Sequence, residues 1–435
     1  MVVVGMARSG VAAAELLQYH GAQVRAIDEN TGPGILPQSE ASFVGADLIV
    51  LSPGVPADLD LIEAQRKIGI LVIGDLELAS WFLSGPIIGI TGANGKTTTT
   101  ALTGHILKQS GVRVQVGGNI GTPPASMVNT SHADQWNVLE LSSFQLETTK
   151  KFHARISTAL NVTPDHLDRH HSMQRYAEAK GRIFHNQTAD DFAVLNADDA
   201  ICSAYAGQTK ARAVWFSSTH EVDGAFLCEG QLILHGTILM PANEIPLRGL
   251  HNVENTLAAA AMAHLAGVSH LQIRTAVKTF PGVEHRIEFV RTLDGVNYYN
   301  DSKATNVDAA LKALAAFDGG VWVILGGKDK NSDYTPLAKL LQERARGVLL
   351  IGATASKIAG QLKGSVEMIS SETLEAAIRQ ANERALPGDT VLLAPACASF
   401  DQFENYEHRG REFKRLVLDL QSKHGLKIKK ESREN

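Results

Sequence analysis

The chain contains apolar segments that run into a glycine-rich turn and then into a helical segment, and this pattern restricts the fold to the α/β class. One example spans residues 2–20 and a second spans residues 86–110. Such turns let a buried parallel strand pass directly into a helix. Further apolar segments alternate with helical patterns, and a third set starts at residue 296. The pattern predicts three α/β domains, over residues 1–84, 85–281 and 282–435.

Composition and charge narrow the classes of partner. The chain has 435 residues, 44% of them hydrophobic and 20% charged, which is typical of a soluble globular protein. A formal net charge of -5 disfavours nucleic acid and anionic lipid. The three cysteines have no CxxC spacing, and no apolar stretch is long enough to span a membrane. Because the start also lacks the features of a signal peptide, we expect a cytoplasmic protein without membrane insertion.

Looser alternation over residues 211–216 and 224–240 predicts a small antiparallel annex within the second domain.

The sharpest functional motif is segment 91–98, TGANGKTT, between a predicted strand and a predicted helix. Two glycines let backbone N–H groups converge on phosphate, a lysine supplies positive charge, and a threonine hydroxyl can reach Mg²⁺. The segment is a shortened variant of the usual phosphate loop, because Ile90 occupies its first glycine position. We predict a nucleoside triphosphate site formed by Gly92, Asn94, Gly95, Lys96, Thr97 and Thr98.

Polar residues near the ends of two later strands predict a metal site. Glu140 interrupts the apolar strand 138–141, and a buried carboxylate needs a partner such as a cation or a core salt bridge. His166 follows another strand, and with His170 it forms an i, i+4 pair that could bind zinc. The sequence offers no third soft ligand. We therefore favour Mg²⁺ at Glu140 and His166, and expect His170 and His171 at the surface.

Lys180 lies on the apolar stripe of a predicted helix over residues 172–184. One interpretation is a side chain that snorkels to keep its ammonium in water. The other is a desolvated, neutral amine that reacts with CO₂ to form a carbamate, which then binds metal as a carboxylate would.

The turn over residues 5–10 stands where a dinucleotide-binding fingerprint would lie, and Asp28 follows the next strand. Ala7 replaces the middle glycine and would hinder a pyrophosphate bound in the NAD manner. The helix start near Ser9 could still attract a phosphate. A nucleotide or nucleotide-sugar site and a purely structural turn are both compatible with this pattern.

A further group of polar turns spans residues 282–286, 300–306 and 325–330. Arg286 could brace a transferring phosphoryl group with its guanidinium. Any single turn could be a simple helix cap, with Asp301 or Ser302 starting the next helix. Three such turns in one predicted domain favour a shared functional face.

Taken together, these motifs resemble those of the Mur ligases, and the resemblance spans essentially the whole chain. It is carried by segments 91–98, 117–121, 140–147, 161–169, 251–255 and 285–286. Segments 301–306 and 395–403 are similar to those of the branch of the family that adds D-glutamate. The resemblance implies a Rossmann-like UDP-binding domain, a central P-loop ATPase-like domain with a parallel sheet, and a Rossmann-like C-terminal domain.

The implied reaction joins D-glutamate to UDP-N-acetylmuramoyl-L-alanine in cytoplasmic peptidoglycan precursor synthesis. The substrate carboxylate would attack the γ-phosphate of ATP to give an acyl phosphate, and the amine of D-glutamate would then displace phosphate. ATP, two Mg²⁺ ions and a CO₂-derived carbamate on Lys180 are the implied cofactors. The resemblance also implies a monomer whose domains close on their ligands.

The same resemblance implies roles for individual residues. The catalytic residues would be Lys96, His166, Lys180 and Arg286, and the metal ligands Thr97, Glu140, His166 and Lys180. Further ATP contacts would be Asn255, Arg286, Asp301 and Lys303. The muramoyl substrate would contact Arg8, Ser9, Asp28, Asn119, Ser142 and His166, and D-glutamate would contact Thr305, Lys330, Ser399 and Tyr406.

Three other functions stay open at this point. A ligase for a different amino acid, including the folylpolyglutamate type, would share most of the motifs. A P-loop NTPase switch would need the 91–98 segment but not Lys180, Lys330 or Ser399. A dehydrogenase is disfavoured by Ala7.

Overall fold

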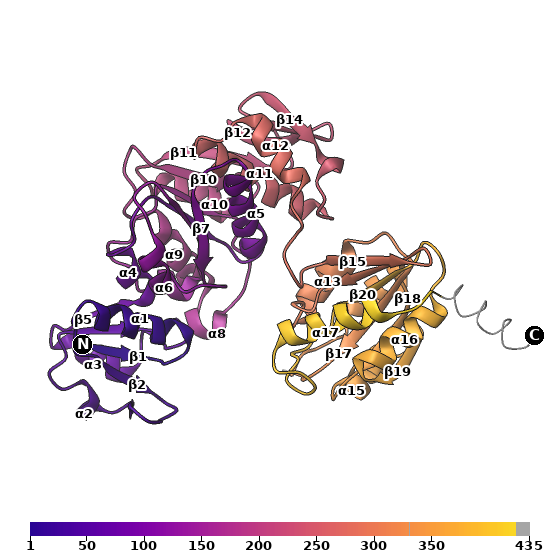
Figure 1. Cartoon of the computed structure of the whole chain (residues 1–435), viewed down its shortest axis with the longest axis horizontal. Helices are drawn as coiled ribbons and strands as arrows, with labels where there is room; N and C mark the ends of the chain where they lie inside the picture. Colours follow the sequence, from indigo (N-terminus) through magenta and orange to yellow (C-terminus); the bar gives the residue numbers. More distant parts are fainter. Residues whose placement is uncertain (330, 423–435) are drawn as a thin grey trace, which may run out of the picture. The chain divides into compact units, whose positions relative to one another are not determined.

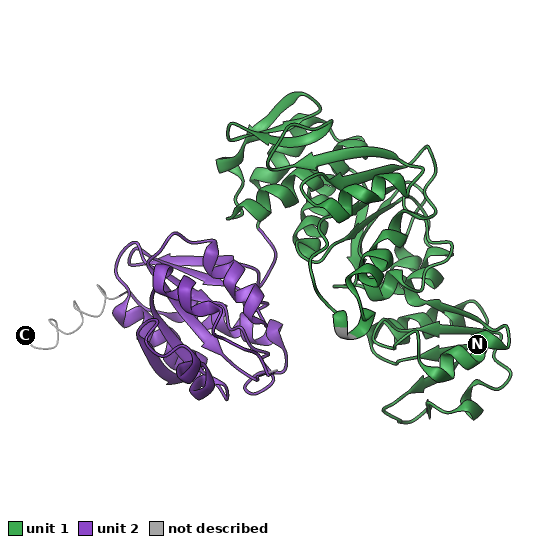
Figure 2. Cartoon of the chain, turned by 180° about the vertical axis from the view of Figure 1, so that it is seen from behind, with its two compact units in different colours: residues 1–281 green, residues 282–435 purple. Residues whose placement is uncertain are grey.

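The computed structural model describes residues 1–329 and 331–422 (Figure 1). Its three sheets follow one another along the chain. By contacts the chain divides into two compact units, residues 1–281 and 282–435, and the first unit carries two of the sheets (Figure 2). The predicted D-glutamate contact Lys330 lies outside the described residues.

The first sheet has five parallel strands in the order β3-β2-β1-β4-β5. The strands are β1 (Val2–Val4), β2 (Arg25–Asp28), β3 (Ile35–Pro37), β4 (Leu48–Leu51) and β5 (Leu71–Gly74). Its helices are α1 (Arg8–Tyr19), α2 (Glu40–Phe43), α3 (Asp60–Lys67) and α4 (Asp75–Ser80). The central strands are buried on both faces, which explains their continuous apolar sequence.

The second sheet has nine strands in the order β14-β13-β12-β11-β10-β9-β6-β8-β7. The strands are β6 (Ile87–Thr91), β7 (Val114–Gly118), β8 (Trp136–Glu140), β9 (Ile156–Ala159), β10 (Phe192–Asn196), β11 (Arg212–Ser217), β12 (Gly224–Cys228), β13 (Gln231–Leu234) and β14 (Thr237–Pro241). Its α-helices are α5 (Lys96–Gln109), α6 (Pro124–Met127), α7 (Ser143–Leu146), α8 (Leu167–His170), α9 (Met173–Gly181), α10 (Ala200–Ala204), α11 (Leu250–Leu265) and α12 (His270–Lys278).

The predicted antiparallel annex is confirmed for residues 224–241, where β12 pairs antiparallel with β13 and β13 with β14, at one end of the main sheet. The prediction is wrong for β11, which pairs in parallel with both β10 and β12 and so extends the main sheet. The loose alternation of β11 reflects a strand that still has one solvent-exposed end, not a change of sheet.

The third sheet has six strands in the order β15-β16-β20-β17-β18-β19, and β15 alone is antiparallel within it. The strands are β15 (Glu288–Leu293), β16 (Val296–Asn300), β17 (Val321–Gly326), β18 (Ala345–Ile351), β19 (Met368–Glu372) and β20 (Thr390–Leu393). Its helices are α13 (Val307–Ala315), α14 (Leu337–Arg344), α15 (Ala355–Gln361), α16 (Leu374–Arg384) and α17 (Tyr406–Asp419). Neither Asp301 nor Ser302 caps α13, because Asn306 does so through its side chain, which accepts the N–H of Ala309 at 2.8 Å.

A buried carboxylate joins the first sheet's last helix to the second sheet. Glu77 of α4 is fully buried, and its oxygens accept the backbone N–H groups of Lys150, Lys151 and Phe152 at 2.9–3.0 Å. It also accepts the indole N–H of Trp81 at 2.9 Å. These bonds replace the water that a buried carboxylate loses.

Candidate active site

The phosphate loop is shaped by glycines and braced from α11. Gly95 has a φ of +82°, and a Cβ there would lie 2.3 Å from Oδ1 of Asn255. That same Asn255 oxygen accepts the hydroxyl of Thr99 at 3.2 Å. No side chain caps α5, so its first N–H groups are available to an anion.

Asn161 supports the other side of the loop. Its carbonyl accepts the N–H of Ala93 at 2.9 Å, and its side-chain oxygen accepts the N–H of Asn94 at 2.8 Å. Thr97 and Thr98, the predicted Mg²⁺ and phosphate contacts, lie largely buried in the first turn of α5. The loop is thus held in place before any phosphate binds.

Lys180 reaches the phosphate loop from α9. The side chain is 1% exposed, and Nζ donates to the carbonyl of Gly92 at 2.7 Å and lies 4.5 Å from the ring centre of Tyr176. Burial, and then the positive charge of Lys96, hold the pKa of Lys180 well below its usual value. The interpretation in which this lysine snorkels into water is therefore wrong.

Glu140 presents a buried carboxylate oxygen that lacks a partner. The side chain is 2% exposed; Oε1 accepts the amide of Asn119 at 3.0 Å, while Oε2 has no hydrogen bond. Leaving a charged oxygen unsatisfied is costly, and a hard cation is the partner that would satisfy it. The Glu140 carboxylate and the Thr97 hydroxyl supply oxygen donors of the kind that Mg²⁺ prefers.

The two predicted histidines differ in their surroundings. His166 is exposed, has a φ of 51°, and stacks at an angle against Phe144 with ring centres 4.8 Å apart. His170 is 5% exposed and shares a hydrogen bond of 2.9 Å with the hydroxyl of Ser143. Burial lowers the pKa of His170 to about 4. The prediction of a surface position is wrong for His170, because Phe144 and Tyr176 cover its ring, whereas His171 is exposed.

Nowhere in the described chain do three His, Cys, Asp or Glu side chains gather closely enough to hold a metal. A ready-made zinc centre at His166 and His170 is thus not present among these residues. The predicted Mg²⁺ set contains only two residues of those four types.

A second part of the site is a cavity of about 470 Å³ between the first and second sheets. The predicted substrate residues that line it are Arg8, Ser9, Asp28 and Asn119, joined by Gln145. Asp28 also holds the turn, because its carboxylate accepts the N–H of Met6, and that bond lowers its pKa. Ser142 does not line this cavity; its hydroxyl caps α7 by accepting the N–H of Gln145 at 3.2 Å.

Gln145 is a cavity residue that was not predicted, although it lies within segment 140–147. Gln145 completes a capping box with Ser142, and the S-x-x-Q spacing was the available signal.

The second unit gathers its own polar cluster. Asp301 is largely buried. Burial raises its pKa to about 7, although the positive charge of Arg286 acts to lower it. Nζ of Lys303 lies 5.6 Å from the ring centre of Tyr406, and the carbonyl of Lys303 accepts the N–H of Thr305 at 2.8 Å. Ser399, also predicted, is buried, and its carbonyl accepts the N–H of Phe403 at 2.9 Å.

Arg409 of α17, which was not predicted, connects the turns that contain Ser302 and Cys397. Its buried guanidinium donates to the carbonyls of Ser302 at 2.9 Å and Cys397 at 3.2 Å, and its Nε donates to the hydroxyl of Ser302 at 3.0 Å. Burial lowers its pKa to about 10, so it stays charged at neutral pH. Its i, i+4, i+8 spacing with Phe413 and Val417 was the available sign that it faces inward.

Two family models match the chain. Residues 90–263 match the Mur ligase middle domain, and residues 285–397 match the Mur ligase glutamate ligase domain. The chain is also 59% identical to the UDP-N-acetylmuramoylalanine–D-glutamate ligase of Solibacter usitatus, over 97% of this chain and 98% of that one. It therefore belongs to the Mur ligase family, a class of amide-bond-forming ligases.

A second relative and two solved structures are consistent with that assignment. The UDP-N-acetylmuramoylalanine–D-glutamate ligase of Koribacter versatilis is 51% identical over 97% of both chains. The UDP-N-acetylmuramate–alanine ligase of Thermotoga maritima shares the fold with a TM-score of 0.62 at 20% identity, over 96% of this chain and 98% of that one. A pseudomurein peptide ligase of Methanothermus fervidus does so with a TM-score of 0.59 at 20% identity, over 97% of this chain and all of that one. The fold is thus the three-domain fold of the Mur ligases.

Proposed function

We propose that this protein is an ATP-dependent ligase that joins the amine of D-glutamate to the carboxylate of UDP-N-acetylmuramoyl-L-alanine. Relatives at 51–59% identity over nearly the whole chain carry that name. One structural observation supports the proposal most directly. Asn119 lines the cavity beside the first sheet, and its amide also donates to Glu140 at 3.0 Å. A substrate seated in that cavity would reach the carboxylate that we assign to the metal.

The phosphate end of the reaction is assigned to α5 and its loop. The free N–H groups of the first turn of α5 would hold ATP phosphates, and Lys96 would turn its ammonium from the carbonyls of Gly92 and Ala93 toward them. Thr97, Glu140, His166 and a carbamylated Lys180 would hold Mg²⁺, which when bound would neutralise charge on the transferring phosphoryl group.

The nucleotide-sugar end is assigned to the turn between β1 and α1. Gly10 packs so tightly that a Cβ would lie 1.8 Å from the carbonyl of Gly5, so the close helix–strand approach of a nucleotide-binding turn is present. Arg8, Ser9 and Asp28 would contact the diphosphate and uridine, while Asn119 and His166 would orient the muramoyl carboxylate.

The amino-acid end is assigned to the second unit. Thr305, Ser399 and Tyr406 would bind D-glutamate or brace its pocket, with Lys330 as a further contact. Arg286, Asp301 and Lys303 would contact ATP, together with Asn255 of the first unit. The same proposal places the enzyme in the cytoplasm as a monomer, with an acyl phosphate as the intermediate.

The test is phosphate release in the presence of ATP, Mg²⁺, UDP-N-acetylmuramoyl-L-alanine and D-glutamate. Release should require both substrates, and Lys96→Ala should abolish it while the exposed control Lys108→Ala should not. Release without D-glutamate would indicate an NTPase. Release supported by another amino acid in its place would indicate a different ligase of this family.

A further inference from the structure

A second cavity of about 470 Å³ lies at the start of β6, at the opposite end of that strand from the phosphate loop. Its wall includes Trp81 and Gly85 from the segment that joins α4 to β6. It also includes Lys151, His153 and Arg155, which precede β9. This cavity takes no part in the ligase reaction proposed above.

The residues that line the cavity bring positive charge without an acidic side chain among them. Lys151 and Arg155 are exposed cations, and His153 adds an imidazole whose second nitrogen, Nδ1, donates a hydrogen bond to an anion when the ring is doubly protonated. Clustered cations of this kind attract a small anion, and arginine can bind an oxyanion with two parallel N–H groups.

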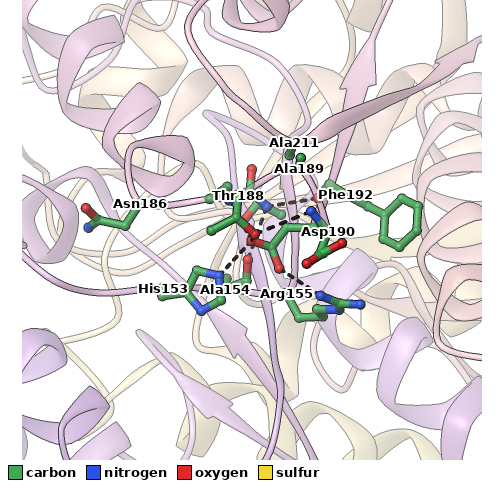
Figure 3. Close-up of polar contacts among 12 residues, drawn as sticks. His153, Ala154, Arg155, Asn186, Thr188, Ala189, Asp190, Phe192 and Ala211 are labelled. Atoms are coloured by element: carbon green, nitrogen blue, oxygen red, sulfur yellow. Dashed lines mark hydrogen bonds and ion pairs between the residues drawn. The ribbon is translucent and has the colours of Figure 1, made fainter.

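A buried carboxylate holds two of these side chains in place. The side chain of Asp191 is fully buried. Its carboxylate accepts a hydrogen bond from Nε2 of His153 at 2.7 Å and another from a guanidinium nitrogen of Arg155 at 3.3 Å (Figure 3). The backbone N–H and hydroxyl of Thr188 also donate to it, at 2.7 and 2.9 Å. Asp191 thus fixes one edge of each side chain, and both remain nearly half exposed, at 47% and 44%. Because these two side chains are already held in place, less side-chain conformational entropy is lost when a ligand binds.

Trp81 supplies a fixed aromatic surface in the same cavity. Its indole N–H donates to Glu77 at 2.9 Å, yet the side chain is 42% exposed. An indole held by its nitrogen can stack with a planar ring of a ligand.

We infer that this cavity binds a small aromatic anion, with its phosphate or carboxylate group at Lys151, His153 and Arg155 and its ring against Trp81. The ligand would contact the connection between the first and second sheets, so its binding should stabilise the first unit by mass action. The site is distinct from the phosphate loop and does not depend on the proposed ligase function.

Titration calorimetry of the full chain with phenyl phosphate and with inorganic phosphate tests this inference. Lys151→Ala should weaken phenyl phosphate binding about tenfold, because one charged contact is lost, and Lys151→Arg should preserve it. The matched control is Lys108→Ala, an exposed lysine on α5 that should leave the affinity unchanged. Because the phosphate loop is the same in every variant, the difference reports only this cavity.

The Trp81→Leu variant tests the indole ring separately from the cationic side chains. It should weaken the binding of phenyl phosphate and leave the binding of inorganic phosphate unchanged. Equal affinities for phenyl phosphate in the wild type and Lys151→Ala would overturn the anion site. Equal weakening of both probes by Trp81→Leu would overturn the aromatic part. Lys151 is exposed, so the variant should fold, and a thermal unfolding midpoint equal to that of the wild type would verify this.

Discussion

Lys96 and Lys180 donate hydrogen bonds to the same oxygen, the carbonyl of Gly92, at 2.8 and 2.7 Å. Their two amines therefore cannot lie farther apart than the sum of those distances. Two positive charges that close repel one another, and burial together with the charge of Lys96 holds the pKa of Lys180 well below its usual value. The loop thus favours the neutral form of the Lys180 amine at the point where ATP phosphates are expected.

The lowered pKa of Lys180 leads to the first prediction. Protein equilibrated with ¹³C-bicarbonate should show one carbamate carbon signal by NMR, and Lys180→Ala should lack it. Lys180→Ala should also lose at least about 100-fold in activity, as expected when a metal-binding group is removed. A signal that persists in Lys180→Ala would place the carbamate elsewhere, and no signal in the active wild type would refute the modification.

Glu140→Gln should separate metal binding from stability. The substitution removes a buried charged oxygen without a partner, so the metal-free protein should be no less stable and could gain about 1 kcal/mol. The Mg²⁺ concentration for half-maximal activity should rise at least about tenfold. Thermal unfolding without Mg²⁺ and activity against Mg²⁺ concentration measure the two effects, with the exposed Glu178→Gln as control. A loss of stability with unchanged Mg²⁺ dependence would contradict the assignment.

Asp301 should make the second unit less stable as the pH rises. Its pKa is raised from 3.8 to about 7, so the folded state favours the protonated acid. The contribution of the protonated Asp301 to the free energy of unfolding is complete below pH 3.8 and is lost between pH 3.8 and about pH 7. This shift in pKa corresponds to at most about 4 kcal/mol. Asp301→Asn should flatten this part of the profile. Urea unfolding of the full chain at several pH values is the measurement, and an unchanged profile in the variant would exclude Asp301 as its source.

Glu77→Gln should destabilise the first unit by about 3 kcal/mol or more. An amide in place of the carboxylate weakens the charge-assisted bonds to residues 150–152 and turns an N–H group toward other donors. Glu63→Gln, which removes a partly exposed ion pair with Arg66, should cost less than about 1 kcal/mol. Urea unfolding of both variants compares the two, and equal losses would show that the buried bonds contribute little.

The sequence predicts the parts of the molecule whose signals are local. The phosphate loop, the helix that carries Lys180 and most strands could be located, because glycine turns and apolar periodicity depend on neighbouring residues. The stripe position of Lys180 also predicted its burial correctly in one of the two interpretations.

Features that depend on distant packing could not be predicted. His170 looked polar and exposed because its cover, Phe144 and Tyr176, comes from two other helices. Glu77 looked like an ordinary residue of a short helix, since its partners lie more than 70 positions away. The direction in which β11 pairs with β10 and β12 likewise cannot be read from alternation alone.

The bonds of Glu77 also bear on how such a chain could be cut and recombined. A fragment ending after residue 84 would keep this carboxylate but lose the three backbone donors that stabilise it. A junction between Pro281 and Gly282 separates the two compact units and breaks none of these bonds. Chimeras between this chain and its relatives should therefore fold when the second unit is exchanged at residue 281, whereas residues 1–84 produced alone should be unstable because Glu77 would lack its backbone donors.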